Sequence, residues 1–162
     1  MATLTALKFS TVDGAEKMLT KIQSLQKMEL IKVQDAAIVT WPVGKSKPKT
    51  KQLVDMAGMG ALQGAFWGML FGLIFFVPFF GLAVGAAFGA LGGKMADYGI
   101  SDEFIKQTRE KVTEGTSALF LMTSDAVQDK VFEELKGYEF ELIASNLTKE
   151  QEEQLMAAFA EE

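Results

Sequence analysis

The sequence predicts an α+β domain that is interrupted in the middle by an apolar helical hairpin. Two observations lead to this fold class. A strand, a helix and a second strand can be recognised on each side of the middle, and the middle itself, residues 56–93, contains no charged residue. The chain has 162 residues, the length of one domain, and all of its 16 basic and 21 acidic residues lie outside this uncharged run.

The first strand, helix and strand precede the uncharged run. Leu7 and Phe9 alternate as in a strand over residues 4–10, and Ser10 or Thr11 can cap the helix that follows. Residues 36–41 (AAIVTW) are typical of a second strand, and a turn at 42–44 leads into a polar strand over 45–53. The helix between the strands has an apolar face with steps of three and four residues: Ala15, Met18, Leu19, Ile22, Leu25 and Met28.

The second unit follows the run. Ser101 can cap a helix that ends by Gly115, and residues 117–122 (SALFLM) form a short apolar strand. A helix that ends at Gly137 comes next, and residues 138–143 alternate as in a strand with Glu139 and Glu141 on its outer face. The apolar residues that define these elements are Phe104, Ile105, Val112, Val127, Val131, Phe132, Leu135, Tyr138, Phe140 and Leu142.

A last helix begins with Thr148 and Gln151 in capping-box positions. Its apolar side is formed by Leu155, Met156 and Phe159. We expect this helix to dock on its own domain, and the alternative is a contact with a partner or a second subunit.

Two such units of this size favour a ferredoxin-like (split βαβ) sandwich, with antiparallel strands and two helices on one face. The alternative is an unrelated α+β domain with the same elements. The predicted organisation is a first half of the α+β domain at 1–52, an apolar helical hairpin that inserts into the membrane at 53–97, and a second half with the C-terminal helix at 98–162.

Glycines recur every four residues in the uncharged run. Each glycine in a helix costs about 1 kcal/mol relative to alanine, so the repetition indicates that close approach of two backbones is needed. Repeated small residues at this spacing pack helices together in lipid. The two sets predict a double glycine zipper that serves helix packing and oligomerisation: Gly60, Gly64, Gly68, Gly72, and then Gly81, Gly85, Gly89, Gly93. The alternative is a glycine-rich hairpin buried inside a soluble assembly.

Pro78 lies between the two glycine sets and is the predicted hairpin turn, because it would break one long helix. The first limb, residues 56–77, would be about 33 Å long, enough for a hydrocarbon core of about 30 Å. The second limb, residues 79–93, would be about 22 Å long and would span only if Lys94 snorkels. A hairpin that spans and one that enters and returns both remain open.

Lysines flank the hairpin at Lys45, Lys47, Lys49, Lys51 and Lys94. By the positive-inside tendency they place both termini and the soluble domain on the cytoplasmic side of the cytoplasmic membrane. The first four are two residues apart, so on an extended arm they share one face that could contact anionic lipid headgroups. Equally, they could be lysines that protect an edge strand from aggregation.

Composition excludes several functions. The chain has no His and no Cys, which removes the usual nucleophile pairs, zinc sites and disulfides, and we predict no catalytic, cofactor-binding or metal-binding residues. Gly44, Lys45 and Ser46 resemble the end of a phosphate-binding loop, but Pro48 follows where a helix is required. The part after the hairpin is acidic, which argues against nucleic acid. We identify no small-molecule substrate.

The order of these parts resembles the uncharacterised bacterial membrane-protein family catalogued as domain of unknown function 1269. The resemblance is most specific in residues 92–112 (GGKMADYGISDEFIKQTREKV), where Asp97, Tyr98, Gly99 and Ile100 match the family's pattern position by position. The turn TWPVGKSKP, at residues 40–48, departs from the more acidic turn expected there. The resemblance implies a fold and a membrane association, but no activity.

These observations favour a non-enzymatic, membrane-associated protein that self-assembles through its glycine zippers as a scaffold or membrane-shaping unit. Its expected partners are membrane lipid and further copies of itself. One alternative is a soluble, closed homo-oligomeric particle whose hairpins are buried inward, against each other or around lipid. Another is an oligomeric pore, for which Gln63 is the strongest polar group of the hairpin.

Overall fold

The computed structural model describes residues 3–52, 64–76, 95–124 and 128–159. These residues form an α+β fold around one antiparallel sheet, which confirms the predicted fold class at this level. The strands are β1 (Thr3–Phe9), β2 (Lys32–Thr40), β3 (Lys49–Gln52), β4 (Ser117–Ser124) and β5 (Glu141–Asn146), in the spatial order β3-β2-β4-β1-β5.

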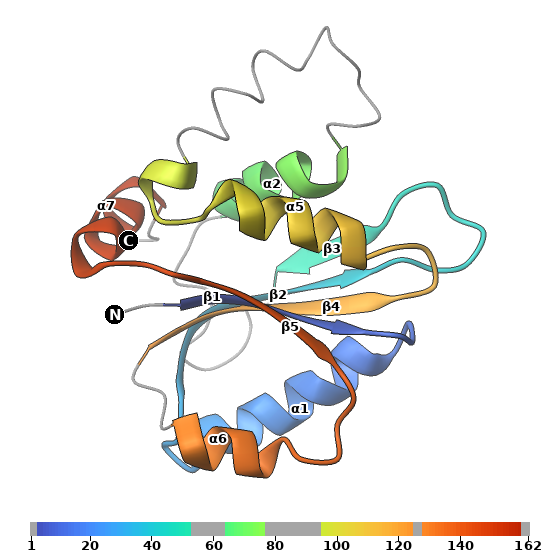
Figure 1. Ribbon diagram of the computed structural model, residues 1–162, viewed down its shortest axis with the longest axis horizontal. Helices are drawn as coiled ribbons and strands as arrows, with labels where there is room; N and C mark the ends of the chain where they lie inside the picture. The colour runs from blue at the N-terminus through green and yellow to red at the C-terminus, as the bar shows by residue number, and fades with distance from the viewer. Residues whose placement is uncertain (1–2, 53–63, 77–94, 125–127, 160–162) are drawn as a thin grey trace, which may run out of the picture.

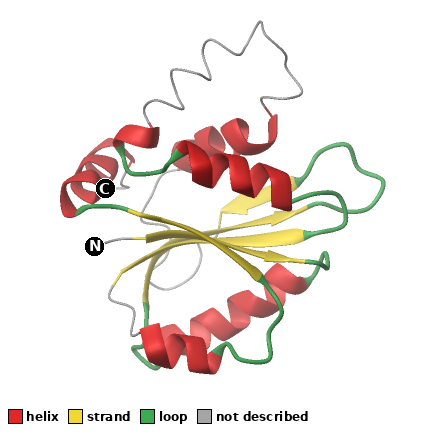
Figure 2. Cartoon of the chain, in the orientation of Figure 1, coloured by secondary structure: helices red, strands yellow, loops and turns green. Residues whose placement is uncertain are grey.

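Helices cover both faces of the sheet (Figures 1 and 2). On one face lie α1 (Gly14–Lys27) and α6 (Gln128–Glu134). On the other lie α2 (Gly64–Phe71), which continues as the π-helix η1 (Gly72–Phe76), and α5 (Asp102–Lys111). The last helix, α7 (Lys149–Phe159), follows β5. We call these the α1 face and the α2 face of the sheet.

The central strands are buried on both faces, and this explains their sequence. In β4 alternate residues enter different clusters: Phe120 packs on the α2 face, and its neighbours Leu119 and Leu121 pack on the α1 face. A strand covered on both sides has no need for polar alternation, and residues 118–122 (ALFLM) contain no polar side chain. The sheet therefore requires an apolar cover on each side.

Several predicted helix boundaries are confirmed. Ser101 caps α5, since its Oγ accepts a hydrogen bond from the Phe104 N–H (3.1 Å). Thr148 and Gln151 form the reciprocal capping box of α7, with distances of 2.9 and 3.1 Å. The start of α1 differs from the prediction of Ser10 or Thr11: its N-cap is Asp13, which makes no side-chain cap hydrogen bond.

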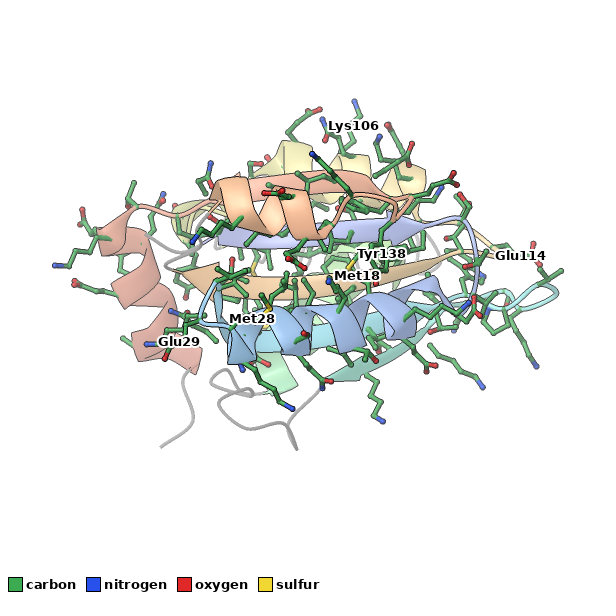
Figure 3. The ribbon with its side chains drawn as sticks, turned by 90° about the horizontal axis from the view of Figure 1, so that it is seen from below. Met18, Met28, Glu29, Lys106, Glu114 and Tyr138 are labelled. Carbon is green, nitrogen blue, oxygen red and sulfur yellow. The ribbon has the colours of Figure 1, made fainter. Side chains whose placement is uncertain are left out.

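A side chain from β4 replaces the missing cap of α1. The Ser117 Oγ accepts from the Ala15 N–H (3.0 Å) and donates to the Thr11 carbonyl (2.7 Å). At the other end of α1, Glu29 takes a left-handed conformation (φ 60°) next to the exposed Met28, while Met18 points from the middle of the helix toward the sheet (Figure 3). The N-terminal end of α1 thus depends on a hydroxyl from another strand, whereas the C-terminal end is closed by N–H groups of residues 28–30 that donate to carbonyls of the helix itself.

The strand that carries the flanking lysines is shorter than the sequence predicts. We expected a strand over residues 45–53, but β3 contains only residues 49–52, and residues 46–47 form a bend. Pro48, which lacks an N–H, directly precedes the strand. Lys49 and Lys51 are therefore on a strand, and Lys45 and Lys47 do not share a strand face with them.

The last strand was predicted on the wrong face. β5 begins at Glu141, not at residue 138, and its buried side chains are Ile143 and Ser145. Tyr138 (42% exposed; Figure 3) precedes the strand, and Leu142 is 50% exposed. The register with β1 explains this, because Ile143 lies opposite Ala6 on the well-covered α2 face, whereas Leu142 lies opposite Leu7 on the α1 face near the sheet edge.

This reversal predicts unequal effects of two alanine substitutions on the free energy of unfolding. Ile143→Ala should lower it by about 3 kcal/mol, because it leaves a cavity in the α2-face cluster. Leu142→Ala should lower it by less than about 1 kcal/mol, because the side chain is already half exposed. Urea unfolding of both variants, followed by circular dichroism, measures the difference, and the opposite order would contradict the assigned register.

Candidate functional site

The described part of the apolar run packs on the sheet. Phe66, Trp67, Leu70, Phe71, Leu73, Ile74 and Phe75 are at most 5% exposed and belong to the α2-face cluster. Trp67 stacks on Phe71 (centroids 5.6 Å apart), and Phe71 meets the Phe120 ring of β4 edge-on at 5.0 Å. Each such aromatic pair adds about 0.5–1.5 kcal/mol beyond burial. In this structure these side chains are buried in one cluster with residues of the chain's own sheet and of α5.

The outer side of α2 is different. Gly68 is exposed, and a Cβ built on it would have no described atom within 4 Å. Gly72, four residues later, is buried at the start of η1. Gly64 is the first residue of α2. Gly68 is thus the glycine of the first set that the structure shows open to a neighbouring helix.

The remaining predicted hairpin residues lie outside the described residues. They are Gly60, Gln63, Pro78, Gly81, Gly85, Gly89, Gly93 and Lys94. No helix formed by the described residues combines the length and the apolar composition that crossing a bilayer requires.

Arg109 of α5 holds the end of the apolar segment. Its Nε donates to the Ile74 carbonyl (2.9 Å), and its Nη2 donates to the Leu73 carbonyl. Carbonyl groups near the end of a helix lack partners within the helix and carry partial negative charge, so a guanidinium there is favourable on both counts. Sequence reasoning missed this residue. A basic residue in the last turn of the helix after the run was the available signal.

The segment after the run is fixed by a glycine turn. Gly99 has φ +92°, and a Cβ on it would lie 2.6 Å from the Gln151 Oε1 of α7. The Gly99 carbonyl accepts a hydrogen bond from the Ser145 Oγ of β5, and the Ile100 N–H donates to the Met95 carbonyl (2.9 Å). Gly99 thus connects the segment that follows the uncharged run to β5, through Ser145, and lies close against Gln151 of α7.

Asp97 and Tyr98 stand in the same turn. Tyr98 is partly buried against the α2-face cluster, whereas Asp97 is exposed. Groups of three or more residues that could hold a metal ion do not occur within the described ranges.

Lys49 and Lys51 lie on the side of the sheet away from α2. They stand opposite Thr40 and Ile38 of β2, and Ile38 packs toward α1. Lys49, Lys51 and Glu16 of α1 line one shallow surface depression there. Because β3 is an edge strand of the described sheet, this position favours the edge-protection interpretation of these two lysines over a headgroup contact beside the apolar segment.

The turn that resembles a phosphate-binding loop uses its donors internally. The Gly44 N–H (φ +86°) donates to the Glu114 carboxylate, and the Trp41 Nε1 donates to the Lys45 carbonyl (2.8 Å). A carboxylate therefore already occupies the glycine N–H that a phosphate would need.

A cavity of about 210 Å³ opens on the α1 face between α6 and the β1–β5 edge. Its lining is apolar apart from three threonines and one asparagine: Thr3, Thr5, Leu7, Ile22, Ile31, Leu121, Thr123, Val131, Leu135, Phe140, Leu142, Ala144 and Asn146. Lys21 of α1 pairs with Glu134 of α6 (2.9 Å), and this hydrogen bond raises the pKa of Lys21 above its usual value. The outer wall of the cavity is formed by three residues of β5, which are Leu142, Ala144 and Asn146.

One comparison with known proteins gives a match. The model of a protein family described as "Protein of unknown function (DUF1269)" matches residues 61–160, which cover most of the run and nearly all of the second half of the domain. Neither a curated protein nor a solved structure matches the chain.

The contact of Arg109 with the end of η1 is testable by substitution. Arg109→Gln should remove hydrogen bonds to two helix-end carbonyls and weaken the docking of α2 and η1 by about 1 kcal/mol, which corresponds to severalfold faster amide exchange in residues 64–76. Lys106→Gln, on the exposed side of the same helix (Figure 3), is the matched control and should leave this exchange unchanged. Equal effects of the two substitutions would contradict the assigned role.

Proposed function

Because the chain belongs to the DUF1269 family of proteins of unknown function, we propose its role from its sequence and geometry: a non-enzymatic, membrane-associated protein that self-assembles as a scaffold or membrane-shaping unit. The observation that carries this proposal is the position of α2. It belongs to an uncharged run, packs one side on the sheet, and leaves Gly68 exposed on the other.

We also propose that the sandwich is ferredoxin-like. The units β1-α1-β2 and β4-α6-β5 interleave in the sheet, since β4 lies between β1 and β2, and β1 lies between β4 and β5. The crossing helices α1 and α6 lie on the same face (Figure 1). This interleaving supports the split βαβ assignment. In that assignment β3 is an additional edge strand, and α2, η1 and α5 cover the second face.

The course of the chain supports a membrane contact on the α2 face. Residue 76 ends η1, and residue 95 begins the helical turn that leads into α5; both lie on this face of the sheet (Figure 1). Residues 77–93 between them are uncharged and contain Pro78 and five glycines. A segment that leaves and returns on one face can enter a bilayer beside it, with the sandwich remaining on one side.

One observation favours the alternative of a soluble, closed particle. The aromatic side chains of residues 66–75 are buried in the chain's own core, so they need no lipid and no hairpin from another copy. In a closed particle the outer side of α2, where Gly68 is exposed, would be buried by neighbouring copies, which contribute the same groups.

Fractionation of cells without detergent distinguishes the two assemblies. The membrane proposal predicts protein in the membrane pellet that resists extraction with alkaline carbonate, because apolar burial in lipid is not weakened by pH. Large, uniform particles in the soluble fraction would support the closed particle. Soluble monomers would contradict both assemblies.

Gly68 tests the self-assembly itself. Gly68→Leu should disperse the purified protein in detergent to smaller particles, because a leucine prevents close approach of a second helix. It should leave the domain folded, since the new Cβ has no described neighbour and leucine favours a helix more than glycine does. Gly68→Ala is the matched control and should assemble nearly as the unmodified chain does. If sedimentation shows an unchanged particle size for Gly68→Leu, the proposed zipper contact at Gly68 is contradicted.

A further inference from the structure

The two edges of the described sheet differ in their protection. β3 is four residues long and carries Lys49 and Lys51, which are features that discourage pairing with another strand. β5 is six residues long, has no lysine, no proline and no shift of register against β1, and exposes Leu142 and Ala144. A sheet that blocks one edge and leaves the other open indicates that the open edge is used.

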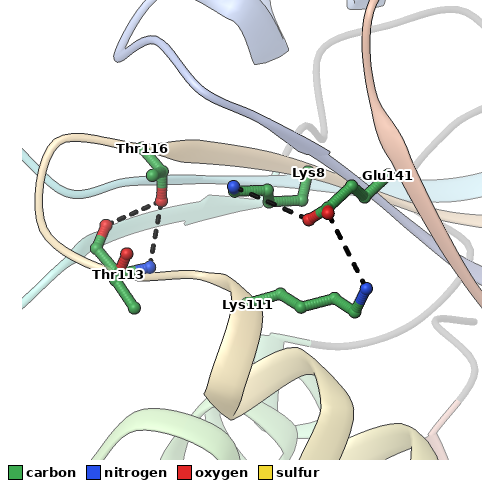
Figure 4. A network of polar contacts seen from close by, with 5 residues as sticks. All are labelled: Lys8, Lys111, Thr113, Thr116 and Glu141. Atoms are coloured by element: carbon green, nitrogen blue, oxygen red, sulfur yellow. Dashed lines mark hydrogen bonds and ion pairs between the residues drawn. The ribbon is translucent and has the colours of Figure 1, made fainter.

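The one charge within β5 does not oppose pairing. Glu141 lies between Lys8 of β1 (3.6 Å) and Lys111 of α5 (3.9 Å), so two cations of its own chain compensate it (Figure 4). Both lysines come from the α2 face, on which Glu141 stands. A second strand beside β5 would therefore meet a locally balanced charge.

The charges at the two ends of β5 are complementary. Glu139 precedes the strand and Lys149 follows it; both are exposed, and neither forms an ion pair with any of the described residues. In an antiparallel pair of two β5 strands, Glu139 of each copy would lie near Lys149 of the other. A parallel pair would bring like charges together.

We propose that the β5 edge is a self-association surface whose occupant is the β5 strand of a second copy, paired antiparallel across a two-fold axis. A register centred on Ile143 places each Leu142 opposite Ala144 of the other copy, which covers both exposed apolar groups. The same contact closes the open side of the cavity on the α1 face, whose outer wall is Leu142, Ala144 and Asn146. This surface is separate from Gly68 and does not require it.

Charge reversal tests the pairing between copies. Glu139→Lys and Lys149→Glu, each made in the full chain, should raise the dissociation constant of the dimer about tenfold or more, because each places two repulsive pairs at the ends of the joined strands. A mixture of the two single variants should recover the original association, since every end pair is then of opposite sign. Analytical ultracentrifugation of the full chain in detergent measures both. Unchanged association in the single variants, or no recovery in the mixture, overturns the proposal.

A lysine placed on each edge separates this contact from the zipper and from misfolding. In the Gly68→Leu background, which removes the other proposed contact, Leu142→Lys should convert dimers to monomers and leave the circular dichroism spectrum unchanged. Thr50→Lys, at an exposed position of β3, is the matched control and should leave dimers intact. Dimers that persist with Leu142→Lys, or that dissociate equally with Thr50→Lys, overturn the β5 contact. If Gly68→Leu does not reduce the particle size, the zipper contact is contradicted, and the β5 contact is still tested by the charge reversals.

Discussion

The need to cover both faces of the central strands governs this structure. β4 supplies apolar side chains to both sides, and the α1 face is covered by helices of ordinary amphipathic pattern. The α2 face is covered by α5 and by residues 66–75, which come from the uncharged run. Part of the most apolar segment of the chain is therefore a core element. Its lack of charge has a sufficient cause in burial against β2, β4 and β1, before any contact with lipid is considered.

Polar groups attach the end of this core element and, further along the chain, the point at which the chain returns to the sheet. Arg109 satisfies carbonyls at the end of η1, and the turn at Gly99 connects the return of the chain to Ser145 of β5. Both attachments lead to the same side of the molecule, where α5 lies over the sheet (Figure 1). Whatever residues 77–93 contact would act on the domain through these two points. The proposed β5 edge lies next to the second of them, so membrane contact and pairing of copies would use neighbouring parts of one scaffold.

Much of the fold could be predicted because its signals are local. A capping box needs only Thr148 and Gln151, a helix N-cap needs only Ser101, and all three hydrogen bonds formed as the spacing indicated. The hydrogen bonds of Arg109 reach back 35 and 36 residues to Ile74 and Leu73; its place in the last turn of α5 is a local signal, but no local pattern identifies partners at such a distance. For the same reason the cap of α1 was placed on Ser10 or Thr11, whereas the hydroxyl that accepts from the helix comes from Ser117 on another strand.

By itself, the sequence determined the type and order of the elements, the single uncharged run, and the absence of histidine and cysteine chemistry, because periodicity, caps and composition are properties of neighbouring residues. Only the tertiary structure decided which face of β5 is buried, which lysines share a strand, and that Trp67 and Phe71 lie on the sheet. Periodicity shows that a side chain needs an apolar neighbour; it does not show whether that neighbour is lipid, another copy or the chain's own sheet. That choice depends on strand register and on the packing of segments far apart in the sequence.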